Sequence, residues 1–287
     1  MILEKKRAET RFGEIAYTDR GEGPVALFVH GVFLNSYFWR HVVDRVCDAR
    51  RCVAVDLMSH GDSQAAPDQD ISFRAQAEML NAFCESLGFE QVDLVANDTG
   101  GAIAQIFAAR HPERIRSLTL TNCDTHDNYP PKAFEATLNA AQVGRGLFSA
   151  RRVQLLADPE LSRPNFAGAY EHVERVSTET LRAYLEPLFR TEEATRNLER
   201  WLIGSSDCSP TTEIEPLLRE LNAPTLIVWG TADEFFPLKW AYWLKETIPG
   251  ARRVIELEGA KLFFPEERPD ALADALREHW STFAVVA

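Results

Sequence analysis

Features that mark several common protein classes are missing from this 287-residue chain. No stretch approaches the ~18 uninterrupted apolar residues of a membrane-spanning helix, and the charged opening, residues 1–14, lacks the apolar middle of a secretion signal. Lysine and arginine total 31 against 43 aspartates and glutamates, and the resulting formal charge of −12 comes without a basic block. We therefore expect a soluble cytoplasmic protein that binds neither nucleic acid nor a membrane.

Cysteine is also scarce: there are five, scattered along the chain, with no C-x-x-C pair. This pattern argues against a disulfide framework and a zinc site, and it fits a reducing cytoplasm. The sequence has no phosphate-binding glycine loop and no cluster of metal-ligand residues. We expect no cofactor and no metal, and a small molecule as the substrate. The identity of that substrate and the oligomeric state stay open.

Two hydrophobic periods alternate along most of the chain, which predicts an α/β fold. Residues 73–87 have apolar side chains at helical spacing, and Gly88 follows as a stop signal. Short apolar runs that end in turn residues predict buried parallel strands at Val25–His30, Cys52–Leu57, Val92–Asn97, Leu118–Asn122, Pro224–Gly230 and Val254–Leu257. We expect a mostly parallel central sheet with helices on both faces, and a ligand beyond the carboxyl ends of the strands.

The alternation fails once, where helical patterns follow one another without a strand. We interpret residues 128–215 as an inserted helical cap, and residues 1–127 with 216–287 as one α/β core. The cap opens with two consecutive prolines after Tyr129 and closes with the loop-like run 204–210. Long insertions in α/β enzymes are often functional lids, although a decorative helical domain is the alternative.

The segment 92–105 (VDLVANDTGGAIAQ) predicts a strand that turns sharply into a helix. Ala96 and Gly100 flank the turn, as the small residues of a nucleophile elbow do. The residue presented at the turn is Asp98, next to a helix N-terminus that favours an anion. A carboxylate there can attack an sp³ carbon or an epoxide to form an ester, although an aspartate that only caps the helix would look the same.

Five segments together resemble the α/β-hydrolase superfamily, in the order that the family has. They are the elbow and the runs 27–40 (LFVHGVFLNSYFWR), 56–63 (DLMSHGDS) and 227–237 (IVWGTADEFFP), followed by 259–269 (GAKLFFPEERP), where the family carries its histidine. An aspartate at the elbow resembles the haloalkane dehalogenase and epoxide hydrolase branch. The resemblance implies an α/β-hydrolase fold, an oxyanion hole from the backbone of Val32 and Thr99, and Asp233 as the acid that orients a base. We expect the pocket to be lined by His30, Phe33, Asn97, Tyr129, Leu262 and Phe263.

The resemblance breaks at the base, because Leu262 occupies the position of the family's histidine and cannot accept a proton. The dehalogenases hold the leaving halide with a tryptophan after the nucleophile and a polar residue in the first loop, where this chain has Thr99 and Val32. Dehalogenation is therefore disfavoured. Epoxide opening would need an acid for the leaving oxygen, usually a tyrosine of the cap, and the candidates here are Tyr129, Tyr170 and Tyr184.

His126 is the candidate for a substitute base, since it follows the strand next to the elbow and has Asp124 and Asp127 as neighbours. A capping histidine is the alternative. His60 and Lys261 are less attractive, the first because it belongs to a turn and the second because it is an ordinary surface lysine.

These observations favour an enzyme with an atypical triad that acts on a small to medium apolar molecule. Asp98 would act as a nucleophile in epoxide opening, or as an acid and base in isomerisation or elimination. A catalytically degenerate ligand-binding or regulatory protein and a dehalogenase-like hydrolase are the alternatives. A further explanation of Leu262 is that it was introduced in place of the histidine to trap an intermediate. Without the histidine, hydrolysis of an Asp98 ester should be slow, because a positioned base ordinarily contributes ~10² to 10⁴ in rate.

Overall fold

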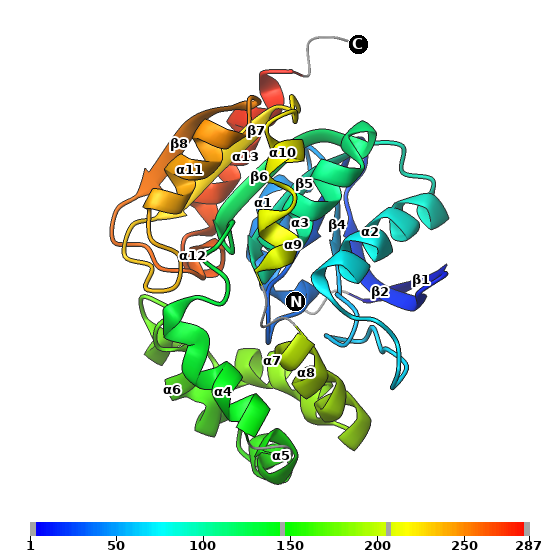
Figure 1. Ribbon diagram of the computed structural model, residues 1–287, viewed down its shortest axis with the longest axis vertical. Helices are drawn as coiled ribbons and strands as arrows, with labels where there is room; N and C mark the ends of the chain where they lie inside the picture. Colours follow the sequence, from blue (N-terminus) through cyan, green and yellow to red (C-terminus); the bar gives the residue numbers. More distant parts are fainter. Residues whose placement is uncertain (1–3, 144–146, 205–207, 284–287) are drawn as a thin grey trace.

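A computed structural model describes residues 4–143, 147–204 and 208–283. Its centre is an eight-stranded sheet with the order β1-β2-β4-β3-β5-β6-β7-β8 (Figure 1). The strands are β1 (Lys6–Thr10), β2 (Gly13–Arg20), β3 (Val25–Val29), β4 (Arg51–Val55), β5 (Val92–Asp98), β6 (Ile115–Cys123), β7 (Thr225–Gly230) and β8 (Ala251–Leu257). The first two strands run antiparallel to their neighbours and the rest are parallel, so the predicted α/β-hydrolase architecture is confirmed.

The parallel strands lie where the sequence predicts them. Every residue of β5 and of β7 is buried, as expected for strands covered by helices on both faces. The hairpin of β1 and β2 was not predicted, because its sequence, with charged residues in β1 and at the ends of β2, lacks a continuous apolar run. Gly13 turns this hairpin with a φ of 96°, which glycine adopts without strain.

Helices cover both faces of the sheet. On one face α1 (Arg40–Val46) packs against α13 (Pro269–Ser281), and on the other α2 (Phe73–Leu87) packs against α3 (Thr99–Arg110), with α11 (Lys239–Thr247) beside β7 and β8 (Figure 1). The α2 helix has the predicted bounds. Ser72 Oγ caps its first turn by accepting from the Ala75 N–H at 3.3 Å, and Gly88 ends it with a φ of 68°.

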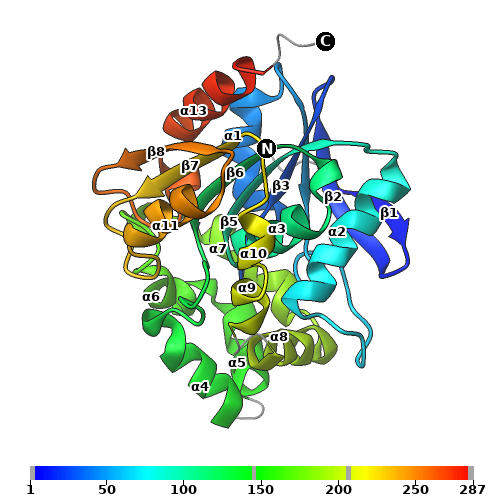
Figure 2. The same cartoon turned by 45° about the horizontal axis from the view of Figure 1, so that its top comes forward.

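Helices follow one another between β6 and β7, in the region predicted to form the cap. They are α4 (Glu135–Val143), α5 (Leu147–Ala157), α6 (Arg163–Phe166), α7 (Thr178–Phe189), α8 (Glu192–Gly204), α9 (Ser209–Thr212) and α10 (Glu215–Leu218). Figures 1 and 2 show α4 to α8 gathered at one end of the sheet, whereas α9 and α10 lie against α3 of the core. The exact cap bounds 128–215 stay a prediction.

Hydrogen bonds connect this cap to the core at several points. The Asn35 side chain donates to the Ala183 carbonyl of α7 at 2.8 Å, and Asn197 of α8 donates to the Ala65 carbonyl at 2.8 Å. The short helix α12 (Phe264–Glu267) follows Phe263, whose N–H donates to the Ala169 carbonyl at 2.9 Å. The space between cap and sheet is thus bounded on several sides. Within the described residues, no helix combines the length and apolarity that crossing a bilayer requires.

Candidate active site

Asp98 lies at the sharp turn between β5 and α3. Its φ of 58° and ψ of −139° are unusual for a residue with a side chain, and such strain is typical of a nucleophile elbow. The neighbours are as tight as the sequence predicts. A Cβ added to Gly100 would lie 2.3 Å from the His30 carbonyl oxygen, and one added to Gly31 would lie 2.2 Å from Asp98 Oδ2. Only glycine allows these two segments to approach.

The backbone N–H groups of Val32 and Thr99 hydrogen-bond to the Asp98 carboxyl group. Their role as an oxyanion hole stays a prediction. Burial nevertheless dominates the electrostatics, because it raises the pKa of Asp98 to about 7 against these two hydrogen bonds, and the negative charge of Asp233 adds to the rise. The carboxyl group therefore changes charge near neutral pH. A group that can carry or release a proton there suits catalysis.

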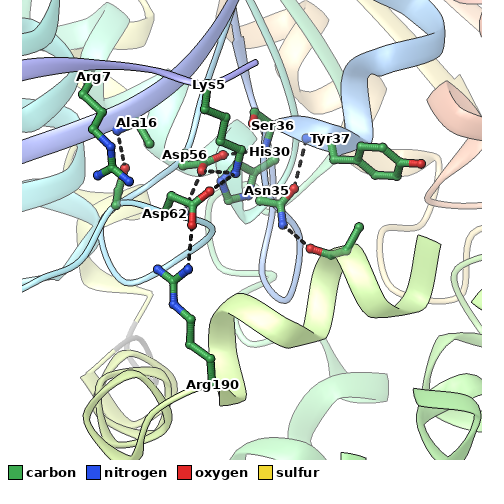
Figure 3. Close-up of polar contacts among 12 residues, drawn as sticks. Lys5, Arg7, Ala16, His30, Asn35, Ser36, Tyr37, Asp56, Asp62 and Arg190 are labelled. Carbon is green, nitrogen blue, oxygen red and sulfur yellow. Dashed lines mark hydrogen bonds and ion pairs between the residues drawn. The ribbon is translucent and has the colours of Figure 1, made fainter. Parts of the chain in front are cut away.

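The loop that carries Val32 is held by Asp56, the first residue after β4. Asp56 Oδ1 accepts from the Ser36 N–H at 2.8 Å, and Oδ2 accepts from the Asp62 N–H at 2.8 Å and from Lys5 Nζ at 2.6 Å. Figure 3 shows these contacts, with Arg190 pairing with Asp62 from the cap side. The run 56–63 thus positions the loop that carries Val32, which we call the oxyanion loop after its predicted role.

His30 supports the same loop. The prediction that it lines the pocket is wrong. Its Nε2 accepts from the Leu57 N–H at 3.0 Å, and its Nδ1 lies 2.7 Å from the Gly31 carbonyl oxygen, to which it donates. Burial lowers the pKa of His30 to about 4, so the ring is neutral. With both nitrogens bonded to backbone, His30 has no lone pair left for catalysis.

A cavity of about 330 Å³ lies above Asp98. Of the predicted pocket residues, Phe33, Tyr129, Leu262 and Phe263 line it, together with Asp98, Val32 and Thr99. Most of the remaining wall is apolar, with aromatic side chains from the cap and from the loop after β7, among them Phe134, Phe148, Phe166, Phe189, Phe235 and Phe236. A cavity of this size and character suits a small apolar ligand.

Asp233 follows β7 and approaches Asp98 closely enough to act on its pKa. Its Oδ1 accepts from the N–H groups of Phe235 at 2.7 Å and Phe236 at 3.2 Å, and its Oδ2 accepts from Asn122 Nδ2 at 2.6 Å. Burial raises the pKa of Asp233 to about 7 despite these donors. The predicted acid is therefore oriented, but the described residues offer it no histidine to orient.

Leu262 stands beside the elbow, as the sequence alignment predicts. Its carbonyl oxygen accepts from Asn97 Nδ2 at 3.1 Å, and its side chain lines the cavity with that of Asp98. Asn97 also donates to Thr121 Oγ1 at 2.9 Å. Asn97 does not line the cavity, contrary to prediction, because its amide is directed between β6 and the loop of Leu262 and fastens them to the elbow.

His126 does not face the cavity. Its Nε2 lies 3.0 Å from Glu215 Oε2, its Nδ1 lies 3.5 Å from Asp127, and its ring packs 4.8 Å from that of Trp243. It is absent from the cavity wall. The substitute-base prediction is therefore not supported by its placement, since a φ of 50° turns His126 toward the helices outside the sheet. Its carboxylate partner is Glu215, which the sequence did not suggest.

Two of the three cap tyrosines are engaged elsewhere. Tyr170 and Tyr184 both donate to Glu266 Oε2, the latter at 3.0 Å, and Arg40 pairs with the same glutamate. Neither tyrosine lines the cavity. They join the cap to the core, and Tyr129 is the cap tyrosine that reaches the cavity.

Asp124 is the cavity residue whose position the sequence reasoning missed, because it was considered only as a partner for His126. Its carboxyl group is fully buried and lines the cavity. The signal was present in the sequence: Asp124 follows the end of a strand adjacent to the elbow strand. A metal does not explain it, since the described residues contain no cluster of three or more metal-ligand side chains.

The family model of the α/β hydrolase fold matches residues 24–267, so the chain belongs to this family. A solved structure of an α/β hydrolase fold protein from Burkholderia ambifaria has a TM-score of 0.83 at 22% identity, covering 97% of this chain and 98% of that one. At this identity the structural match supports the fold alone.

Two named relatives extend over nearly the whole chain. Haloalkane dehalogenase 2 of Mycobacterium tuberculosis is 26% identical, with 97% of this chain and 95% of the relative aligned. Epoxide hydrolase 3 of Xenopus tropicalis is 25% identical, with 96% of this chain and 76% of the relative aligned. The chain is thus an α/β-hydrolase-fold enzyme related to haloalkane dehalogenases and epoxide hydrolases.

Proposed function

We propose that this enzyme opens the epoxide ring of a small apolar molecule, with Asp98 as the nucleophile. The observation that carries the proposal is the Asp98 carboxyl group, held at a strained turn beneath an apolar cavity and hydrogen-bonded by two backbone N–H groups. Attack by one carboxylate oxygen on a ring carbon forms an ester and breaks the bond from that carbon to the ring oxygen. The ring oxygen becomes an alkoxide, which takes up a proton. A cytoplasmic location stays a prediction.

An epoxide suits the cavity better than a haloalkane. A leaving halide needs hydrogen-bond donors that face it, and the positions where the dehalogenases place them hold Val32 and Thr99. The valine side chain donates nothing, so the Thr99 hydroxyl is the one side-chain donor at these two positions. A strained ring releases its own strain on opening, and its oxygen needs only a proton. A carboxylate nucleophile suits both epoxide opening and dehalogenation. The leaving group is therefore the feature that separates the two reactions.

The fate of the ester depends on Leu262. Water is a poor nucleophile without a base, and the leucine side chain beside Asp98 offers none. We expect the Asp98 ester to be long-lived and turnover in heavy-oxygen water to label Asp98 slowly. Non-hydrolytic proton transfer by Asp98, for isomerisation or elimination, would instead give product without any ester.

A ligand-binding protein is the second candidate, and Leu262 is the observation that favours it. Loss of the base with retention of the cavity would leave a protein that binds a small apolar molecule without converting it. Such a protein should saturate with ligand and return it chemically unchanged.

Intact-protein mass spectrometry with styrene oxide tests the proposal. We expect wild-type protein to gain the mass of one styrene oxide, located at Asp98 by peptide sequencing, and Asp98→Asn to gain none. Asp127→Asn is the matched control, because Asp127 is an exposed carboxylate outside the cavity. Product without any adduct or oxygen label would favour proton transfer, and unchanged ligand would favour the binding protein.

A further inference from the structure

Asp124 belongs to the cavity wall, and its carboxyl group is buried without a hydrogen-bond partner among the described residues. Its exposed fraction is 0%, and within the described residues neither carboxyl oxygen accepts or donates a hydrogen bond. Its backbone is fixed, because Gln105 Nε2 donates to the Asp124 carbonyl at 2.8 Å. A carboxyl group in such a place loses several kilocalories per mole of solvation if it ionises, so it is expected to hold its proton.

The sheet brings Asp124 close to the nucleophile. Asp98 ends β5 and pairs with Cys123, the last residue of β6, so Asp124 is the next residue along the neighbouring strand. Asp233 follows β7 on the other side of β6. Burial, with the negative charges of Asp98 and Asp233, raises the pKa of Asp124 well above its usual range.

We propose that Asp124 is the acid that protonates the leaving oxygen when Asp98 opens an epoxide. The inference rests on the proposed function and adds a second catalytic residue to it. A neutral carboxyl group beside a carboxylate is a division of roles that two carboxyl groups adopt when they share one proton. Both residues belong to the wall of the same cavity, and they lie at the ends of neighbouring strands.

The step balances within this pair. A bond forms between an Asp98 oxygen and a ring carbon, the bond from that carbon to the ring oxygen breaks, and the proton of Asp124 moves to that oxygen. Asp98 becomes a neutral ester and Asp124 a carboxylate, so the pair carries one negative charge before and after. Slow hydrolysis of the ester by water regenerates Asp98 and releases one proton, which Asp124 takes up, so both groups are restored.

The tyrosines that the sequence suggested for this proton do not replace Asp124. Tyr170 and Tyr184 donate to Glu266 and lie outside the cavity wall. Tyr129 lines the cavity and is the competing donor. Removing each hydroxyl or carboxyl group separately distinguishes the two.

The test compares two probes with the same carbon skeleton, styrene oxide and 2-phenylethyl iodide. Iodide is a good leaving group that needs little help from donors, so we expect both probes to alkylate Asp98. Iodide leaves without a proton, whereas the alkoxide needs one. Asp124→Asn keeps the size and neutrality of the protonated side chain and removes its acidity. We expect this variant to form the styrene oxide adduct ~10² to 10⁴ times more slowly, while the iodide adduct forms at the wild-type rate. That normal rate also shows that the variant is folded.

Asp127→Asn is the control and should react with both probes as wild type does. Equal rates of epoxide opening in Asp124→Asn and wild type would overturn the inference and leave Asp98 as nucleophile intact. A selective loss of epoxide opening in Tyr129→Phe, with Asp124→Asn unaffected, would assign the acid to Tyr129 and also overturn it. Failure of styrene oxide to label Asp98 in wild type would contradict the proposed function itself, and this inference with it.

Discussion

Two buried aspartates in matching places differ completely in their partners. Asp56 follows the last residue of β4, Asp124 follows the last residue of β6, and both side chains are fully buried. Asp56 is bonded to Lys5 and to two backbone N–H groups (Figure 3), whereas the Asp124 carboxyl group has no hydrogen-bond partner among the described residues. The same residue type thus has opposite surroundings at the two strand ends.

The difference separates a buried carboxylate that holds the fold together from a buried carboxyl group that is available for a reaction. A buried carboxylate that is fully hydrogen-bonded fixes the loops that donate to it, and here these include the loop that carries Val32. A buried carboxyl group without a partner is unfavourable for stability, and natural proteins retain such groups mainly where reactivity is required. The oxyanion-loop side of the molecule is therefore paired, whereas on the cavity side Asp124 has no hydrogen-bond partner among the described residues and Asp98 has two backbone N–H groups.

The largest effect is expected from giving the cavity side a base. Leu262→His would place an imidazole beside Asp98, within the reach of Asp233, and should speed release of the Asp98 ester by ~10² to 10⁴. The measurement is the decay of the adduct by intact mass after excess styrene oxide is removed. Leu262→Phe, which changes shape without adding a base, is the control. An equally slow decay in the histidine variant would show that Asp233 does not orient a base.

The same substitution at the two aspartates should change stability in opposite directions. Asp56→Asn leaves Lys5 without its buried partner, so we expect unfolding free energy to fall by about 3 kcal/mol. Asp124→Asn removes a group that must take up a proton on folding, so stability at pH 7 should hold or rise. Urea denaturation at pH 7 measures both. A loss of similar size in the two variants would contradict the distinction between them.

The sequence predicts the elements with strong local signals and misses those set by tertiary contacts. The elbow, its small neighbours Ala96 and Gly100 and the parallel strands are local patterns, and the structure has them in the expected places. The hairpin of β1 and β2 is half exposed and charged, so its pattern is weak. The domain bounds and the catalytic roles stay predictions.

Side-chain direction could not be predicted at the end of β6. Asp124 and His126 lie two residues apart, yet one lines the cavity and the other packs on Trp243. The sequence favoured histidine, because of its usual pKa, and paired Asp124 with it. Which of the two faces the cavity depends on how the chain leaves the strand, including the positive φ at His126, and no periodic pattern encodes that.

A smaller effect should appear in the pH dependence of stability. The folded pKa of Asp98, about 7, exceeds the ordinary value of 3.8 because of burial, so between these pH values the native state holds a proton that the unfolded state has lost. Stability therefore falls as pH rises from 4 to 7. Asp98→Asn should remove this fall, so its stability should exceed that of wild type at pH 8. Parallel thermal melts of both proteins across pH 5 to 8 measure it, and identical slopes would contradict it.

The smallest effect should come from the surface end of the paired side. Arg190, at the end of α7, pairs with Asp62 at 2.7 Å, but its side chain is 38% exposed. Exposed ion pairs contribute little because water screens them. Arg190→Gln should therefore lower stability by less than about 1 kcal/mol and, since Asp62 still receives Lys5 at 2.9 Å, should leave the rate of Asp98 alkylation unchanged. Urea denaturation in low and high salt measures the first effect, and adduct formation with 2-phenylethyl iodide measures the second. A slower alkylation would mean that the pair of Arg190 and Asp62 helps to position the oxyanion loop, through Asp56 and Ser36. The paired side would then contribute to the chemistry as well as to the fold.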